Sequence, residues 1–282
     1  MTSLKKAFLG ASLFALALFP LLGEPAKSEG LSFITLPEGL EFPWCPECDQ
    51  DQIDHQRRDF SHYSLCYRES YEQAEWSAYR LDREELHKTT TRTDDFRPDP
   101  LITTGSASLA DYRKSGYDRG HLSPAADFSF DENAMSETFY MSNMSPQTAG
   151  LNRGLWKDLE SHVRYLCRRY GRVYVISGPV LNKDCSEFET IGPNKVAVPQ
   201  SYYKVLLVPI YLDADDMDSP DTAYSLETIG FIMPNQKLTG TIFDYSCTVD
   251  KIEEMTGLDF FYTLDKEVQD SIEKEYHKEI WD

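Results

Sequence analysis

The sequence predicts an α+β fold, with strands and helices mixed around a central sheet. Three runs rich in β-branched and aromatic residues predict strands at 173–176, 202–208 and 224–232. From residue 155, apolar side chains recur at three- and four-residue spacing (Leu155, Leu159, Val163, Leu166), which predicts an amphipathic helix over about 155–170. Further helices are expected at 249–257 and 265–278. The sequence contains no internal repeats and no low-complexity tracts.

The chain of 282 residues divides into three parts. Residues 1–28 are interpreted as a signal peptide or an N-terminal anchor, because Lys5 and Lys6 precede an apolar run that ends before small residues suited to cleavage. Residues 29–57 form a polar, proline-containing extension. The remaining residues, 58–282, are enough for one domain with a substantial core. We therefore expect an exported protein, periplasmic or secreted, with an uncleaved N-terminus as its one means of membrane attachment. No feature of the sequence assigns an oligomeric state.

An even number of cysteines fits an exported chain and favours up to three structural disulfides, whose pairing the sequence leaves open. The six are Cys45, Cys48, Cys66, Cys167, Cys185 and Cys247. Cys45 and Cys48 could instead form a redox motif or half of a zinc site. However, they lie in a proline- and acid-rich extension, and the sequence offers no matching second pair. We therefore favour a structural disulfide.

The formal net charge of −19 argues against a nucleic-acid partner when taken alone. The charges are unevenly distributed, however. Residues 113–172 hold nine Lys/Arg against seven Asp/Glu, whereas 249–282 hold eleven acids against four lysines. The acidic stretches are therefore expected to form a solvated surface away from the basic block.

Within the basic block, three motifs place a base, an oxygen ligand, a carboxylate and several arginines close together. They are Asp118-Arg119-Gly120-His121, then Asn143-Met144-Ser145-Pro146-Gln147, then Leu151-Asn152-Arg153-Gly154-Leu155-Trp156-Lys157-Asp158-Leu159-Glu160. Hydrolysis of a phosphodiester needs a base to activate water, and positive charge to stabilise the phosphate and the leaving oxygen. The block therefore indicates a phosphodiesterase centre.

His121 is the candidate general base, since imidazole titrates near neutral pH. Asn152 is the candidate metal ligand, because its amide oxygen suits Mg²⁺, which keeps several waters. Asn152 could also cap the helix that follows. Arg119 stands two positions before His121, so on an extended segment both side chains lie on one face and the guanidinium can hold phosphate oxygens. Asn143 is expected to position the base or a loop beside the metal.

These motifs resemble those of the DNA/RNA non-specific endonucleases, the ββα-metal nucleases that include endonuclease G. The resemblance covers roughly residues 58–265 and implies a ββα-metal nuclease fold with a mainly antiparallel sheet. It also implies cleavage of both DNA and RNA to products with 5′-phosphates, and dependence on Mg²⁺, with Mn²⁺ or another divalent cation as the alternative.

The resemblance assigns supporting roles to further residues. Glu160 would hold a water beside the ion or orient Arg164, its i+4 neighbour on the helix, and Arg164 would reach phosphate. The family has one more arginine upstream, a position that Arg92 or Arg97 could fill, and we take Arg92 as the phosphate-binding candidate. Two other readings stay open: an inactive nuclease fold that serves as a binding protein, and a thiol–disulfide exchange protein that acts through Cys45 and Cys48.

Overall fold

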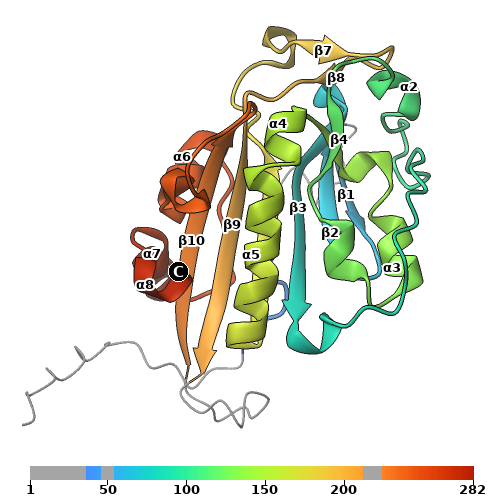
Figure 1. Ribbon diagram of the computed structural model, residues 1–282. Helices are drawn as coiled ribbons and strands as arrows, with labels where there is room; N and C mark the ends of the chain where they lie inside the picture. The colour runs from blue at the N-terminus through green and yellow to red at the C-terminus, as the bar shows by residue number, and fades with distance from the viewer. Residues whose placement is uncertain (1–35, 46–53, 212–223) are drawn as a thin grey trace, which may run out of the picture.

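The structure is a computed structural model that describes residues 36–45, 54–211 and 224–282. Its centre is a seven-stranded sheet in which every neighbouring pair of strands is antiparallel (Figure 1). The strands, in spatial order, are β1 (His55–Asp59), β2 (Ser64–Arg68), β3 (Gln73–Asp82), β6 (Arg172–Pro179), β9 (Ser201–Tyr211), β10 (Tyr224–Pro234) and β11 (Ser246–Cys247). The predicted α+β class and antiparallel sheet are confirmed. The expected leader, residues 1–28, lies outside the described residues, and so does Cys48.

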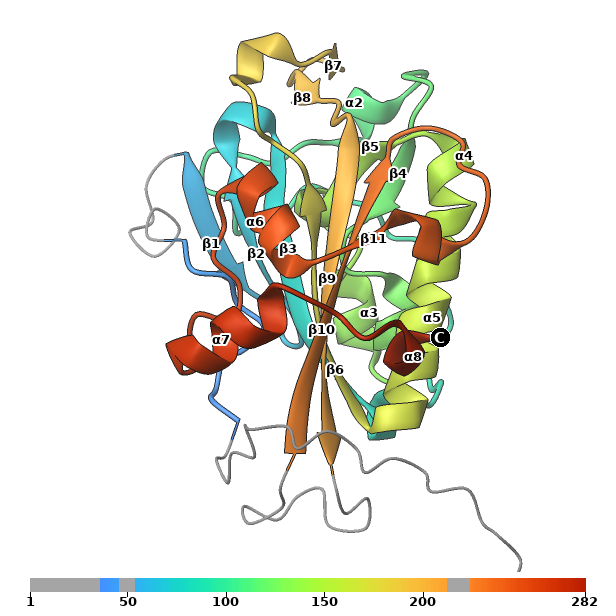
Figure 2. The same ribbon diagram turned by 90° about the vertical axis from the view of Figure 1, so that its left-hand side faces the viewer.

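Helices cover both faces of this sheet. The long helix α5 (Leu155–Tyr170) lies on one face, whereas α6 (Val249–Thr256) and α7 (Lys266–Glu273) lie on the other (Figures 1 and 2). Each face therefore has its own apolar layer, and the central strands are buried on both sides.

The run 202–208 shows why the central strands could be predicted. Its alternate residues Tyr202 and Leu206 pack on the α5 side, and Tyr203, Val205 and Leu207 pack on the α6 side. A strand buried on both faces needs apolar residues in succession, which gives the continuous apolar run of the sequence. Burying one such side chain contributes about 1.5–3 kcal/mol.

Helix α5 follows the predicted apolar stripe, with Leu159, Val163 and Leu166 fully buried against the sheet. It ends at Gly171, whose φ of 89° is a conformation that glycine adopts without steric cost. The helix predicted at 265–278 is wrong as a single element, because the chain forms α7 and a separate short helix, α8 (Lys278–Trp281). Trp281 then packs into the α5-side core.

Short elements complete the fold. The paired strands β4 (Asp118–His121) and β5 (Met144–Gln147) lie beside the main sheet, and β7 (Thr190–Ile191) pairs with β8 (Val196–Ala197). The short helices are α2 (Leu109–Tyr112), α3 (Glu132–Glu137) and α4 (Ala149–Asn152), with 3₁₀ turns η1 (Glu69–Tyr71), η2 (Arg83–Glu85), η3 (Ala125–Phe128), η4 (Met141–Asn143), η5 (Cys185–Glu187) and η6 (Ile242–Tyr245).

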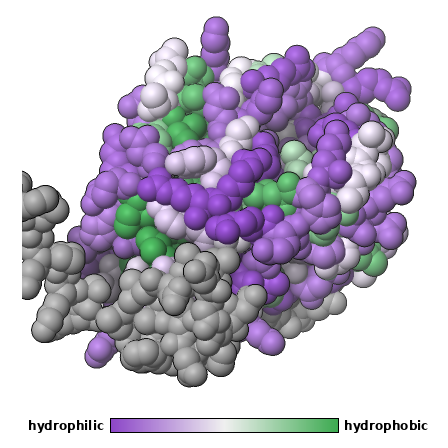
Figure 3. All heavy atoms as spheres, turned by 60° about the horizontal axis from the view of Figure 1, so that its bottom comes forward, coloured by the Kyte–Doolittle hydropathy of each residue, from purple (hydrophilic) through white to green (hydrophobic). Residues whose placement is uncertain are grey.

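The N-terminal extension is partly described and packs on the domain. Leu40 is fully buried, Trp44 forms an isolated β-bridge with Asp259, and the extension continues into β1 at His55. The face seen from the bottom of Figure 1 is largely hydrophilic, with apolar side chains visible as separate patches (Figure 3). Within the described ranges, no helix has the length and apolar character needed to cross a bilayer.

Candidate active site

The three sequence motifs fold into one ββα unit. Strand β4 carries the first motif and pairs with β5, which carries most of the second, so that Asp118 lies opposite Gln147 and His121 opposite Met144. The chain then turns through α4 into α5. Gly120 is required by this pairing, because a Cβ atom there would lie 2.3 Å from the side chain of Gln147.

His121 lies in an apolar enclosure at the end of β4. Its side chain is 8% exposed, and its ring meets Phe139 edge-on at 5.0 Å and Phe96 at 5.9 Å between centroids. Its Nε2 atom has no hydrogen-bond partner in the described structure. Burial, followed by the positive charges of Arg92 and Arg119, lowers the pKa of the imidazole to about 3. The ring is therefore neutral at physiological pH, which is the form that accepts a proton.

Asp118 and Asn152 are joined directly. The amide Nδ2 of Asn152 donates to Asp118 Oδ2 at 3.0 Å, and Arg153 donates to both oxygens of the same carboxylate at 2.8 and 2.7 Å. Burial alone would raise the pKa of Asp118. The hydrogen bonds from Arg153 and Asn152, together with the positive charges of Arg153 and Arg119, outweigh this effect, so the pKa lies below its ordinary value. Asp118 thus stays ionised and fixes the rotation of the Asn152 amide.

This fixed amide fits the role of a hard-metal ligand. With Nδ2 committed to Asp118, the amide oxygen of Asn152 is the atom left to accept, and the side chain lines a cleft of about 570 Å³. A cleft-facing oxygen is the donor type that Mg²⁺ and similar ions select. The expectation that Asn152 caps the next helix is wrong: Asn152 is the last residue of α4, and Gly154 is the N-cap of α5.

The cleft is locally positive although the whole chain is strongly acidic. Four arginines and two aspartates line it, namely Arg92, Arg113, Arg119, Arg153, Asp94 and Asp118. The guanidinium of Arg119 stacks at 4.0 Å over Phe96, and that of Arg92 at 4.7 Å over Phe139. These are the two rings that enclose His121, so both cations are held next to the imidazole.

The structure also separates the two upstream arginines. Arg92 lines the cleft, where its Nε donates to Asp94 Oδ1 at 2.7 Å. Arg97 does not line the cleft; it donates to Asp95 and to the carbonyl of Ser136 and stacks over Tyr140. Arg97 therefore serves the packing of its own loop, and Arg92 is the one placed to meet a ligand in the cleft.

Asn143 is fully buried and holds the chain that follows His121. Its Oδ1 accepts from the amide of Ser123 at 3.0 Å, and its Nδ2 donates to the carbonyls of Ser123 and Thr138. Its own carbonyl accepts from the amide of Leu122. Asn143 thus fixes the backbone next to His121, and none of its hydrogen bonds among the described residues goes to the imidazole.

Glu160 and Arg164 share a face of α5 but have different partners. Arg164 Nη1 donates to Asp127 Oδ1 at 2.6 Å and Nη2 to Ser161 at 3.1 Å. Among the hydrogen bonds of the described residues, none joins Glu160 to Arg164 or to Asn152. Burial raises the pKa of Glu160 to about 7, while the nearby Lys204 opposes this rise.

Comparisons with known proteins decide the family. The sequence profile of the DNA/RNA non-specific endonucleases matches residues 47–267. The chain belongs to this family. It is 35% identical over 209 residues to human mitochondrial endonuclease G, covering 70% of this chain and 67% of that protein. It is 36% identical over 225 residues to nuclease C1 of Cunninghamella echinulata var. echinulata, covering 74% of this chain and 84% of that protein.

Two further relatives extend this result. Mouse mitochondrial nuclease EXOG is 30% identical over 220 residues, covering 74% of this chain, and the match spans 58% of that protein's length. A crystal structure of an EndoG/EndoGI complex, described as showing the mechanism of EndoG inhibition, contains a chain with a TM-score of 0.65 and 33% identity. The match covers 74% of this chain and 87% of that chain. The ββα-metal nuclease fold implied by the motifs is confirmed by this neighbour.

The sequence analysis did not identify two charged residues that lie beneath α5. Lys204, on β9, is fully buried, donates to Ser177 Oγ and lies 4.7 Å from the ring of Trp156. Asp127, also buried, receives Arg164 and, at 2.6 Å, the hydroxyl of Tyr79. A signal for Lys204 was present, since it is the single charge within the apolar run 202–208. Asp127 has no such signal.

Gln147 is a further residue without an assigned role. It is fully buried, and neither Nε2 nor Oε1 has a hydrogen-bond partner in the described structure. It lies opposite Asp118 in the β4–β5 pair, and its side chain packs against Gly120.

The burial of His121 predicts a loss of stability in acid. In the unfolded chain its pKa returns to 6.5, whereas in the folded protein it is about 3. Between these values the unfolded state binds a proton that the folded state excludes. The free energy of unfolding therefore falls as the pH decreases through this window, by at most about 1.4 kcal/mol per pH unit from this group.

Urea unfolding at roughly pH 7 and pH 4.5 measures this contribution. The His121→Gln variant, which cannot take up the proton, should lose less stability over this range than the wild type. Equal losses in both proteins would show that another group, such as the partly buried His162, is responsible.

Proposed function

We propose that this chain is a divalent-metal-dependent endonuclease that hydrolyses phosphodiester bonds in both DNA and RNA. The observation that carries the proposal is the neutral, buried imidazole of His121 beside a cleft lined by four arginines and the oriented amide of Asn152. Membership of the family supports the reaction class.

In this proposal His121 takes the proton from the attacking water. The ring is neutral before the reaction, and its Nε2 has no hydrogen-bond partner in the described structure, so this atom is available for that proton. Arg119 and Arg92 hold the non-bridging phosphate oxygens, because guanidinium groups bind phosphate through paired hydrogen bonds. Stacking on Phe96 and Phe139 fixes both guanidinium planes before substrate arrives, which reduces the entropy lost on binding.

Asn152 would hold the metal ion, with Asp118 fixing its amide. When bound, a hard divalent cation stabilises negative charge on the phosphate and on the departing oxygen. Mg²⁺ suits the single protein oxygen, with Mn²⁺ or another divalent cation as the alternative. Glu160 would hold a water beside this site, and Asn143 keeps the backbone after His121 in place. Arg164, fixed by Asp127, would add positive charge for the phosphate.

Action on both DNA and RNA follows from the kind of contact the cleft offers. Arginine contacts to phosphate fix a nucleic acid in place without reading its sequence. Because the net charge of the chain is −19, we expect weaker long-range attraction of nucleic acid than in a basic nuclease, and a greater need for the divalent cation.

We also propose that the protein is exported. Support comes from the sequence alone: two lysines, an uncharged apolar run from Ala7 to Gly23, and small residues before Glu29. The absence of arginine from residues 1–28 speaks against a mitochondrial presequence. N-terminal sequencing of the protein recovered from its native host tests this proposal. A mature chain that begins near Glu29 supports it, and an intact Met1 points to an uncleaved anchor.

The nuclease proposal is tested with plasmid DNA and with RNA, in Mg²⁺ or in EDTA, using protein that lacks residues 1–28. We expect cleavage of both substrates in Mg²⁺ and none in EDTA. Because residues that merely support a metal ligand contribute 10- to 100-fold, Asn152→Ala should lower the rate by at least about 100-fold.

Asn133→Ala is the matched control, since Asn133 is exposed on α3 and away from the cleft. It should cleave like the wild type. Absence of cleavage by folded wild-type protein across several divalent metals would favour an inactive, binding role for this fold.

A further inference from the structure

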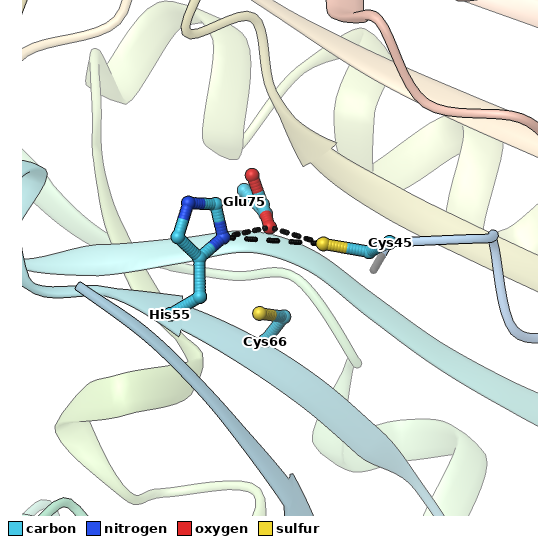
Figure 4. Close-up of side chains that lie close together, drawn as sticks. All are labelled: Cys45, His55, Cys66 and Glu75. Carbon is cyan, nitrogen blue, oxygen red and sulfur yellow. Dashed lines mark hydrogen bonds and ion pairs between the residues drawn. The ribbon is translucent and has the colours of Figure 1, made fainter. Parts of the chain in front are cut away.

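A second group of metal-binding side chains lies outside the cleft. Cys45 precedes β1, His55 is on β1, Cys66 on β2 and Glu75 on β3, and one donor atom of each lies within 4.8 Å of all the others (Figure 4). Cys45 and Cys66 belong to the apolar layer on the α6 side of the sheet, opposite α5. The sequence alone offered no second pair of ligands beside Cys45, whereas the fold brings three from separate strands.

Three distances within the cluster fit the edges of a tetrahedron around one ion. Glu75 Oε1 lies 3.3 Å from Cys45 Sγ and 3.2 Å from His55 Nδ1, and Cys45 Sγ lies 3.9 Å from His55 Nδ1. For zinc bound to sulfur at about 2.3 Å and to nitrogen or oxygen at about 2.0–2.1 Å, tetrahedral geometry puts neighbouring ligands roughly 3.3–3.8 Å apart. These three donor atoms thus stand at coordination distances from a common centre, and Cys66 Sγ lies within 4.8 Å of each of them.

The surroundings orient two of the donors. His55 directs Nδ1 into the cluster, and its Nε2 lies 3.7 Å from Asp54 Oδ2. A carboxylate behind a histidine is the usual support of a metal-binding imidazole. Arg68 Nη1 donates to Glu75 Oε2 at 3.1 Å, which leaves Oε1 toward the cluster and offsets part of its negative charge.

The backbone is irregular at this point. The pairing of β2 with β3 shifts register, so that Cys66 pairs with Trp76 and Tyr67 with Ala74, and Glu75 between them pairs with neither. A β-bulge of this kind re-aims a side chain and is common at functional positions. Here it brings a charged residue to the same point as Cys66 in an otherwise apolar layer.

We propose that Cys45, His55, Cys66 and Glu75 form a structural zinc site that fastens the N-terminal extension to the β1–β3 edge of the sheet. Mixed sulfur, nitrogen and oxygen donors in a tetrahedron favour zinc over Mg²⁺ or Ca²⁺. Four protein ligands also leave no position for substrate, so the site stabilises the fold and takes no part in the nuclease reaction.

A disulfide is the competing use of these sulfurs, and Cys45 and Cys66 are disulfide-bonded in the structure. A disulfide gives no reason for an imidazole and a carboxylate to converge on the same point. Arg68 already pairs with Oε2 of Glu75, and a zinc ion would in addition neutralise Oε1 and the two thiolates. Zinc bound to the reduced thiolates accounts for all four donors, and the zinc-bound and disulfide forms exclude one another.

The test is metal analysis of the full chain, purified with a reductant and without chelator. We expect about one zinc per chain, and replacement by Co²⁺ should give the intense near-ultraviolet absorption of thiolate bound to cobalt. His55→Ala and Cys66→Ser should abolish both signals. Asp54→Asn should weaken Co²⁺ binding by roughly 10- to 100-fold.

Two controls separate this site from the catalytic one. Cys185→Ser removes a free thiol elsewhere in the chain, and Asn152→Ala removes the proposed catalytic ligand. Both variants should keep the zinc. Less than about a tenth of an equivalent of zinc in folded, reduced wild-type protein, together with a Co²⁺ complex that lacks thiolate absorption, overturns the proposal even if the ligand variants fail to fold. Zinc retained by both His55→Ala and Cys66→Ser would also overturn it.

Discussion

His121→Ala is expected to lower the rate of plasmid cleavage by about 10²- to 10⁴-fold, the contribution of a positioned general base. The structure offers no substitute, because the enclosure around the ring is built from Phe96 and Phe139, neither of which accepts a proton. Arg119 and Arg92 remain in this variant, so substrate binding should change little, and the loss should fall on kcat rather than KM.

The fold of this variant should survive. Removing the buried ring leaves a small cavity between Phe96 and Phe139. It breaks no hydrogen bond of Nε2, because this atom has no partner in the described structure. Circular dichroism and thermal unfolding check that point. His87→Ala, at an exposed histidine, is the matched control and should cleave normally. Wild-type rates from a folded His121→Ala protein would remove His121 from the mechanism.

The predictable parts of this molecule are those whose signal is local in the chain. The ββα unit carries its three motifs within residues 118–160, so the candidate site residues His121, Arg119 and Asn152 are close together in the sequence as well as in the fold. The central strands and α5 were equally visible, since a helix buried on one face leaves an apolar period in the sequence and a strand buried on both faces leaves a continuous apolar run.

The less predictable parts depend on long-range contacts or on backbone detail. Glu160 was expected to hold a water or to orient Arg164, whereas the partner of Arg164 in the structure is Asp127, which lies 37 residues away in the sequence. Asn152 does not cap α5, because the helix is interrupted between α4 and α5. There Gly154 lies so close to the carbonyl of Gly150 that a Cβ atom would be 2.5 Å from its oxygen.

The four-donor cluster shows the same limit. Cysteine spacing suggested a disulfide near Cys45, because a zinc site needs partners that the local sequence did not supply. His55, Cys66 and Glu75 come from three different strands, and a bulge in β3 accompanies Glu75. None of these relations has a period or a fixed spacing in the sequence.

Lys204→Met is expected to lower the free energy of unfolding by up to about 3–5 kcal/mol at pH 8, because it leaves the half-buried carboxylate of Glu160 without the buried positive charge that acts on it. Lys204 is fully buried, and Glu160 and Asp127 are the negative charges that act on it. Burial lowers the pKa of Lys204 to about 8 and raises that of Glu160 to about 7, so each group is held in its charged form mainly by the other. Without the lysine, the pKa of Glu160 should rise further.

The pH dependence of this loss follows from its sign. A carboxyl group whose pKa is higher in the folded protein than the ordinary 4.5 destabilises the fold at any pH above 4.5. The cost of Lys204→Met should therefore shrink as the pH falls from 8 to 5. Combining it with Glu160→Gln, which removes the stranded charge, should restore most of the stability at pH 8.

Urea unfolding of the two single variants and the double variant measures this coupling, with Lys157→Met, at an exposed lysine on α5, as the control. Additive losses would mean that Lys204 and Glu160 do not share a charge. The same set of proteins separates stability from catalysis. If Glu160 must be ionised to serve the site, the double variant should recover most of the stability of the wild type and still cleave slowly. Lys204→Met should instead regain activity as the pH rises. That pattern would identify Lys204 as the residue that keeps Glu160 on α5 charged.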